Sequence, residues 1–318
     1  MNMRKKLLIS AVLLAAMILS PLTAMDRHKT VQTAASAEKQ NKNTVSILLS
    51  EKGTVIETGE REYIIGVLAA EADMTCHEEA LKAQAVAYYT YLKYNELNGS
   101  TEKFGGADIS DDTKTCQGYL DPEGRKEKWG DKYEEYEKLA EKVADEISGK
   151  IITYNDEPIL AVYHELSGGI TESAETVWGK DYPYLQSVES AGDRLSADYS
   201  KTVVLTEDEF KDYAKKLDGA KLSDDIEEWI TLDEVNENGY VKKLTVGEKS
   251  FTGEQFRNAF GLNSCNFTVK HDEERFTVRT LGKGHMVGMS CYGADYMARQ
   301  GSDYEQILAY YYKNTEIV

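Results

Sequence analysis

The chain has 318 residues, of which 41% are hydrophobic, enough for one large hydrophobic core or two small ones. With 37 Lys and Arg against 55 Asp and Glu, its formal net charge is −18. Because so acidic a chain repels phosphate backbones and anionic lipid, the composition argues against a nucleic-acid partner and against adhesion to an anionic membrane surface.

The N-terminal segment places basic residues before apolar ones. Arg4, Lys5 and Lys6 precede an uncharged stretch, 7–25, which would be roughly 28 Å long as a helix. This order is typical of an export signal, either cleaved or retained as a single-span anchor. The length favours an anchor over residues 1–25, with the rest of the chain outside the cytoplasm because basic flanks stay inside. Beyond the three basic residues, the chain has 34 basic and 55 acidic side chains, a net charge of −21.

Residues 26–43 are polar and lack aromatic side chains, which predicts a flexible linker before a domain at 44–318. In this domain the pattern predicts a strand from Thr44 and a helix from His77 to Leu97. A second amphipathic helix is expected over 129–147, and a hairpin over 150–164.

The second half alternates short elements. We expect a capping box at 206–209, strands near 238–246, 266–270 and 275–280, and helices near 254–260, 289–300 and 303–312. The last helix is expected to be capped by Ser302, with Glu305 at position N3. Hairpins and helices without a regular βαβ alternation favour the α+β class.

Known chemical motifs are scarce in this sequence. There is no GxSxG element and no HExxH element, and the glycine-rich loop 282–288 departs from the spacing of nucleotide-binding loops. Among the carboxylates, Glu71 differs by context, because it follows an apolar run and precedes a helix. Burial there would raise its pKa and suit it to general acid catalysis, whereas a solvated Glu at a helix start is the structural alternative.

Three ordered blocks of the sequence carry a family resemblance. The first holds Ala-Ala-Glu at 69–71 and Glu-Ala-Leu-Lys-Ala-Gln-Ala-Val-Ala at 79–87, and the second begins His-Glu-Leu-Ser-Gly-Gly-Ile-Thr at 164–171. The third holds Gly-His-Met-Val-Gly-Met-Ser at 284–290, and the stretch 107–119 contains Asp-x-x-x-x-Cys-Gln-x-Tyr. Together they resemble the stage II sporulation protein D (SpoIID/LytB) domain family from about Tyr63 to the C-terminus.

The resemblance implies a lytic transglycosylase that cleaves the MurNAc–GlcNAc linkage of denuded peptidoglycan strands during engulfment, with formation of 1,6-anhydro ends. It implies Glu71 as the single catalytic residue, acting first as acid and then as base. The positions that match the family and would bind substrate are Lys82, Gln84, His164, Ser167, Gly168, Gly169, His285 and Ser290. No cofactor and no metal is expected.

The chain departs from the family pattern at several positions. Ala72, Asp73 and Met74 follow the key Glu where the family has Met and Pro, and an Arg of the first block is absent from 87–91. In the third block the usual Trp, Gly, Gln and Trp are replaced by Lys283, Met286, Cys291 and Tyr292.

The resemblance also implies partners and a location. These are the stage II sporulation amidase P and membrane scaffold protein M, at the mother-cell membrane, with the catalytic domain facing the intermembrane space. The alternative is a relative without catalytic activity that binds glycan or enhances an amidase.

Several side chains keep a structural alternative. His164 and His285 would either line a groove or hydrogen-bond loops, and Tyr88, Tyr89 and Tyr91 are expected to pack because they extend a helical stripe. The four cysteines allow three disulfide connectivities. Cys116 and Cys291 fall in separate blocks and could form a disulfide, or bind zinc with a histidine as some relatives do, although no ligand spacing supports zinc.

Overall fold

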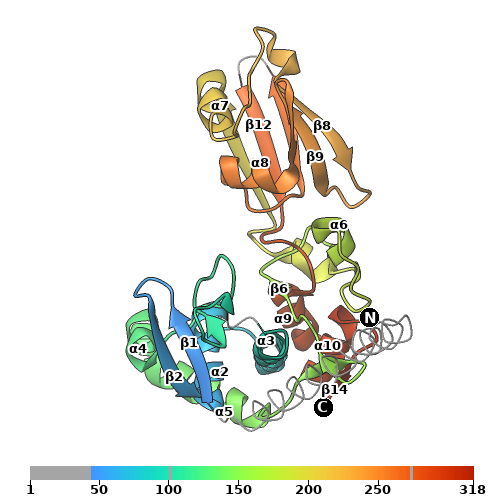
Figure 1. Cartoon of the computed structure of the whole chain (residues 1–318). Helices are drawn as coiled ribbons and strands as arrows, with labels where there is room; N and C mark the ends of the chain where they lie inside the picture. The colour runs from blue at the N-terminus through green and yellow to red at the C-terminus, as the bar shows by residue number, and fades with distance from the viewer. Residues whose placement is uncertain (1–43, 100–101, 273–274) are drawn as a thin grey trace, which may run out of the picture.

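The computed structural model describes residues 44–99, 102–272 and 275–318. They form a larger body, below in Figure 1, and a lobe above it that begins with β7 (Ser200–Thr206) and ends with β12 (Arg275–Leu281). Each part has its own hydrophobic core. The chain enters and leaves the lobe on neighbouring strands, since Ser200 pairs with Leu281. Helices and mostly antiparallel sheets are mixed without regular alternation, which confirms the α+β class.

The body is built from helices around three small sheets. Its helices are α2 (Glu60–Glu71), α3 (Glu78–Leu97), α4 (Pro122–Trp129), α5 (Tyr133–Glu146), α6 (Ala174–Trp178), α9 (Cys291–Arg299) and α10 (Tyr304–Tyr311), with 3-10 turns η2 (Gly130–Lys132) and η3 (Ala191–Leu195). Its strands are β1 (Thr44–Leu49), β2 (Thr54–Gly59), β3 (Ile109–Ser110), β4 (Ile152–Tyr154), β5 (Glu157–Pro158), β6 (Tyr163–His164), β13 (Met289–Ser290) and β14 (Glu316–Ile317). The sheets have the orders β2-β1-β3, β14-β4-β5 and β13-β6.

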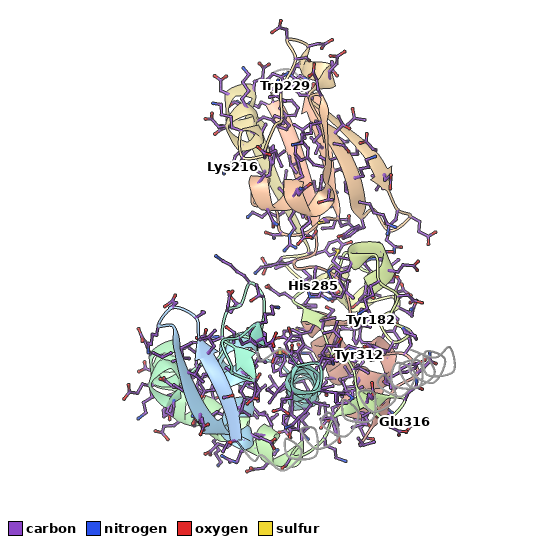
Figure 2. All side chains as sticks on the ribbon, viewed as in Figure 1. Tyr182, Lys216, Trp229, His285, Tyr312 and Glu316 are labelled. Carbon is purple, nitrogen blue, oxygen red and sulfur yellow. The ribbon has the colours of Figure 1, made fainter. Side chains whose placement is uncertain are left out.

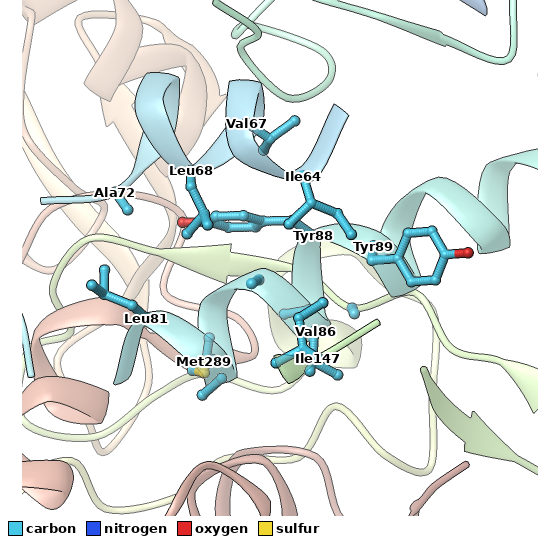
Figure 3. Close-up of a cluster of buried hydrophobic side chains, with 14 of the residues drawn as sticks. Ile64, Val67, Leu68, Ala72, Leu81, Val86, Tyr88, Tyr89, Ile147 and Met289 are labelled. Carbon is cyan, nitrogen blue, oxygen red and sulfur yellow. The ribbon is translucent and has the colours of Figure 1, made fainter. Parts of the chain in front are cut away.

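Helices α2 and α3 form the centre of the body. The apolar run 63–69 makes α2 buried on all sides, and α3 is buried over most of its length because small Ala side chains let neighbours approach. Figure 3 shows Tyr88 lying among α2 side chains such as Leu68, whereas Tyr89 is turned away from them. Both tyrosines are buried, which confirms the expected packing role of this stripe.

A glycine in α2 lets the segment after β3 cross the helix closely. A Cβ on Gly66 would lie 2.2 Å from the ring of Tyr119, and the backbone N–H of Leu120 donates to the Gly66 carbonyl at 3.1 Å. This close approach aligns the segment 117–120 with the C-terminal half of α2.

The helix predicted over 129–147 is α5 for most of its length, but residue 129 still belongs to the preceding helix α4 and residues 130–132 to η2. Helix α4 starts with Pro122 after an Asp121 cap and ends at Gly130, whose φ of 51° favours glycine. After η2 the chain continues as α5, and the buried guanidinium of Arg125 joins α4 to both neighbours. It donates to Glu62 of α2 at 2.7 Å and to both carboxylate oxygens of Glu137 of α5, at 2.9 and 2.7 Å.

The lobe contains two three-stranded antiparallel sheets, of orders β10-β9-β8 and β11-β12-β7. Its elements are β7 (Ser200–Thr206), α7 (Glu207–Ala214), η4 (Ile226–Glu228), β8 (Ile230–Val235), β9 (Val241–Val246), β10 (Lys249–Thr252), α8 (Gly253–Phe260), β11 (Phe267–Asp272) and β12 (Arg275–Leu281). Stacked aromatic rings fill its core, with the Phe210 ring centroid 4.2 Å from that of Phe276. The predicted capping box at 206–209 is present at the start of α7.

The N-terminal cap of α10 differs from the expectation. Asp303 caps the helix and Gln306 completes the capping box, not Ser302 and Glu305. Ser302 belongs to the turn that closes α9, because its N–H donates to the Met297 carbonyl at 3.1 Å. Helix α10 therefore begins one residue later than the motif suggested.

The expected anchor, 1–25, and linker, 26–43, lie outside the described residues. Within 44–99, 102–272 and 275–318, no helix combines the length and apolar character that crossing a membrane requires.

Candidate active site

The carboxylate of Glu71 lies at the C-terminal end of α2 and is half-buried. Its Oε1 accepts a hydrogen bond from the backbone N–H of Gly118 at 2.5 Å. A Cβ at position 118 would lie 2.8 Å from that same oxygen, so glycine allows the backbone to reach the carboxylate. Within the described residues, no hydrogen bond joins the protein to Oε2. One oxygen is thus fixed and the other is left for a further partner.

Buried phenols from three elements surround Glu71. Burial raises the pKa of Tyr63, Tyr88 and Tyr163 well above 10, and the charge of Glu71 adds to this rise, so all three hydroxyls are neutral at physiological pH. Tyr63 donates to Gln117 Oε1 at 2.8 Å, and the rings of Tyr88 and Tyr163 are 4.6 Å apart. These three phenols therefore add no charge to the surroundings of the carboxylate.

Gln84, a predicted substrate-binding residue, belongs to this neighbourhood. It is buried on α3, and its Oε1 accepts a hydrogen bond from the Tyr88 hydroxyl at 3.0 Å. Its Nε2 has no hydrogen-bond partner among the described residues. A buried donor without a partner costs free energy until it finds an acceptor, and a bound ligand can supply one.

Lys82, also predicted to bind substrate, is surrounded by protein carboxylates. Its Nζ lies 2.5 Å from Glu146, 2.9 Å from Glu79 and 3.2 Å from Glu78. The ammonium joins the start of α3 to the end of α5, and its side chain is only 11% exposed. The structure thus gives Lys82 a contact that stabilises the packing of two helices, and its role toward substrate stays a prediction.

The Ser-Gly-Gly segment and Ser290 are organised by a buried carboxylate that the sequence motifs did not reveal. Asp193 is fully buried and accepts hydrogen bonds from the Ser167 N–H and the Ser290 hydroxyl, both at 2.8 Å. Burial raises the pKa of Asp193. Asp193 follows the second family-like block, which runs from Tyr163 to Ser190, by three residues, and this proximity was the signal available in the sequence.

The two glycines of this segment meet side chains from different parts of the molecule, Gly168 from the lobe and Gly169 from η3 of the body. A Cβ on Gly168 would lie 2.6 Å from the amide nitrogen of Asn266, and Gly169, with φ of 96°, would place one 2.4 Å from the Arg194 guanidinium. The segment 167–169 therefore forms part of the connection between body and lobe.

His164 and His285 are hydrogen-bonded to the same backbone region. His164 Nδ1 lies 3.2 Å from the Val287 carbonyl, which makes it the donor, and His285 Nδ1 accepts from the Val287 N–H at 3.1 Å. Burial lowers the pKa of His164 to about 3 and that of His285 to about 4. Both rings are neutral at physiological pH and join the glycine-rich loop to β6.

The two histidines lie on the other side of β6 from Glu71. Successive strand residues point to opposite faces, so Tyr163 packs on Tyr88 while His164 faces His285, with ring centroids 5.9 Å apart. His285 lies near the meeting of body and lobe in Figure 2. Apart from Lys82, the predicted residues thus form two groups, one around Glu71 and one around the histidine pair, joined through β6 and its parallel partner β13.

The four cysteines are free thiols, so the disulfide left open between Cys116 and Cys291 is absent. In the described part of the chain, no three His, Cys, Asp or Glu side chains converge on a point where they could hold a metal ion. The described residues therefore provide no ligand set for the zinc alternative that the sequence left open.

Similarity to known proteins extends over most of the sequence. A family model described as "Stage II sporulation protein" matches residues 50–154, which include Glu71, Gln84 and Gly118. Stage II sporulation protein D of Bacillus subtilis (strain 168) is 38% identical over 258 residues, covering 80% of this chain and 73% of the relative. The chain belongs to the stage II sporulation protein D family.

Other members of the stage II sporulation protein D family and its relatives match over similar lengths. Stage II sporulation protein D of Bacillus amyloliquefaciens is 32% identical over 296 residues, 91% of this chain and 85% of the relative. A protein of Bacillus subtilis (strain 168) named "Amidase enhancer" is 27% identical over 304 residues, 79% of this chain but 40% of the relative.

Proposed function

We propose that this member of the stage II sporulation protein D family is a peptidoglycan lytic transglycosylase that cleaves the MurNAc–GlcNAc linkage of denuded glycan strands. The observation that carries the proposal is the setting of Glu71. It is a half-buried carboxylate with one oxygen fixed by Gly118 N–H, surrounded by neutral phenols. Such a group is placed to exchange one proton with a bound ligand.

The reaction needs a single residue that acts twice. Protonated Glu71 donates its proton to the glycosidic oxygen, and the bond from that oxygen to muramyl C1 breaks. The resulting carboxylate accepts the proton of the muramyl C6 hydroxyl, whose oxygen bonds to C1. The products are a free GlcNAc hydroxyl and a 1,6-anhydro-MurNAc end, and Glu71 is again protonated. A hydrolase would need a second carboxylate as nucleophile or as base for water.

Partners and place in the cell belong to the same proposal. The glycan must first lose its stem peptides, so an amidase such as the stage II sporulation amidase P would act before this protein. Membrane scaffold protein M would hold both enzymes, and the N-terminal segment would anchor the chain with its domain facing the intermembrane space. The acidic charge of the domain favours a substrate freed of its charged peptides.

The test is mass spectrometry of products from denuded glycan strands, with wild type and Glu71→Gln compared. We expect Glu71→Gln to lower the release of anhydro ends by roughly a hundred-fold or more, because it can neither donate nor accept the proton. Glu57→Gln is the matched control, since Glu57 is an exposed carboxylate on β2, and it should keep activity. Full turnover by folded Glu71→Gln would refute the proposal.

A second candidate function is supported by the relative named "Amidase enhancer". In that case the chain binds glycan without cleaving it and raises the activity of an amidase. The same experiment separates the two functions: anhydro ends identify the transglycosylase, reducing ends a hydrolase, and unchanged strands favour the enhancer.

A further inference from the structure

Lys128 of α4 contacts the end of α2 immediately before Glu71. Its Nζ donates to the carbonyl of Ala69 at 2.7 Å and to that of Ala70 at 2.9 Å. The last carbonyls of a helix lack partners within the helix and form the negative end of its dipole. The last turn of α2 has no basic residue of its own, so the capping cation comes from another element.

The position of this ammonium is fixed by the packing of α4. Arg125, three residues earlier, is buried and holds α4 to Glu62 of α2 and Glu137 of α5. The Lys128 side chain extends from this fixed helix to the carbonyls of α2, which leaves its charge next to the Glu71 backbone. Burial, the largest effect, lowers the pKa of Lys128, whereas the charges of Glu71 and Asp73 raise it.

The other titratable groups that interact electrostatically with Glu71 or with Lys128 come from several elements. They are Tyr63 on α2, Asp73 after it, Tyr88 on α3, Tyr163 on β6 and Cys291 at the start of α9. The three phenols and the Cys291 thiol are neutral at physiological pH, because burial raises the pKa of each well above its ordinary value. Asp73 is a carboxylate, so Lys128 supplies the positive charge in this set.

We propose that Lys128 is a positioning residue for Glu71, whose ammonium caps α2 and favours the carboxylate that forms when Glu71 gives up its proton. This inference rests on the proposed function and deepens it. A carboxylate at the negative end of a helix is disfavoured, and a cation bound to the final carbonyls offsets that effect. Lys128 would thus make proton donation by Glu71 easier without touching the glycan.

The test compares the pH dependence of anhydro-product release by wild type, Lys128→Met and Lys128→Arg. Without the cation, the protonated form of Glu71 persists to higher pH, so the alkaline limb of the profile for Lys128→Met should move up by about one pH unit. Its plateau kcat, measured below that limb, should fall several-fold because Glu71 is then the weaker acid, while KM stays unchanged. Lys128→Arg keeps the charge and should restore the wild-type profile.

Lys126→Met is the matched control, because Lys126 lies on the same helix and faces the ring of Tyr133 instead of α2. It should leave both profile and KM unchanged. The inference is overturned if Lys128→Met keeps the wild-type profile, or if it raises KM alone, which would make Lys128 a substrate contact.

Titration of the Glu71 side-chain carboxyl by 13C NMR tests the inference separately from the proposed function. The Glu71 signal is assigned by its loss in Glu71→Gln, and its midpoint should move to higher pH in Lys128→Met. If wild type releases no anhydro ends, the proposed function fails while this shift still reports on Lys128. If wild type is active and the midpoint does not move, only the inference fails.

Discussion

At the scale of single residues, the site depends on the protonation states that burial imposes. Glu71 is held by one backbone N–H, and the phenols around it stay neutral because burial raises their pKa. On the other face of β6, burial has the opposite effect on bases and keeps His164 and His285 neutral. The glycine-rich loop that precedes Ser290 therefore depends on uncharged histidines.

The histidine pair predicts a pH dependence of folding. Their pKa in the folded state, about 3 and about 4, lies below the ordinary value of 6.5. Because the unfolded chain binds more protons in this range, their stabilising contribution is fully present above pH 6.5 and is lost as the pH falls toward 4 and then 3. Urea unfolding of wild type between pH 7 and 4 should show this loss, and His285→Asn should have a smaller slope. An equal slope in the variant would contradict the prediction.

At the scale of elements, the position of α4 relative to α2 decides which groups reach Glu71. The close crossing at Gly66 brings the segment with Gly118 to the carboxylate, and α4 follows directly with Lys128. Arg125 holds this arrangement through two carboxylates on two different helices. The ion cluster around the buried Arg125 thus supports two contacts at the C-terminal end of α2: that of Gly118 with Glu71 and that of Lys128 with the last carbonyls.

Arg125→Met should therefore destabilise the body. The substitution leaves Glu62 and Glu137 without their cation, and we expect the free energy of unfolding to fall by about 2–3 kcal/mol. This loss is smaller than for a fully buried ion pair because the Glu62 side chain is 34% exposed. Arg61→Met removes an exposed cation on α2 and should cost less than about 1 kcal/mol. Chemical denaturation measures both, and equal effects would show that the buried cluster has no special role.

At the scale of the whole molecule, two separate cores are joined through the segments that carry the family-like motifs. The lobe contacts the body where Gly168 meets Asn266 and where Glu172 accepts a hydrogen bond from the Asn236 amide at 2.8 Å. Glu172 is buried, and burial raises its pKa. The Ser-Gly-Gly segment thus connects the lobe to the body, while Glu71 lies inside the body on α2.

Because the cores are separate, they should respond separately to mutation. Phe210 is fully buried in the lobe among Trp229, Phe260 and Phe276, so Phe210→Ala should destabilise the lobe by about 3–5 kcal/mol through the cavity that it leaves. Differential scanning calorimetry should show two transitions, of which only the lobe transition moves. A single transition that shifts as a whole would show that the two parts unfold together.

The sequence by itself determined the class of fold, the extent of α3, the capping box before α7 and the special context of Glu71. These features depend on local periodicity and neighbouring residues, which the chain carries wherever it folds. The family blocks added Gln84, Ser167 and Ser290, although not the reason why they lie where they do.

Only the tertiary structure decided what surrounds these residues. Gly118 meets Glu71 across 47 positions and Lys128 meets Ala69 across 59, contacts that follow from the packing of helices and not from any pattern within one helix. Lys82 matches a family motif and yet contacts three carboxylates, because the ends of α3 and α5 meet there. Local sequence patterns determine where each helix and strand forms. The site forms where elements that are distant in sequence pack together as the core is buried.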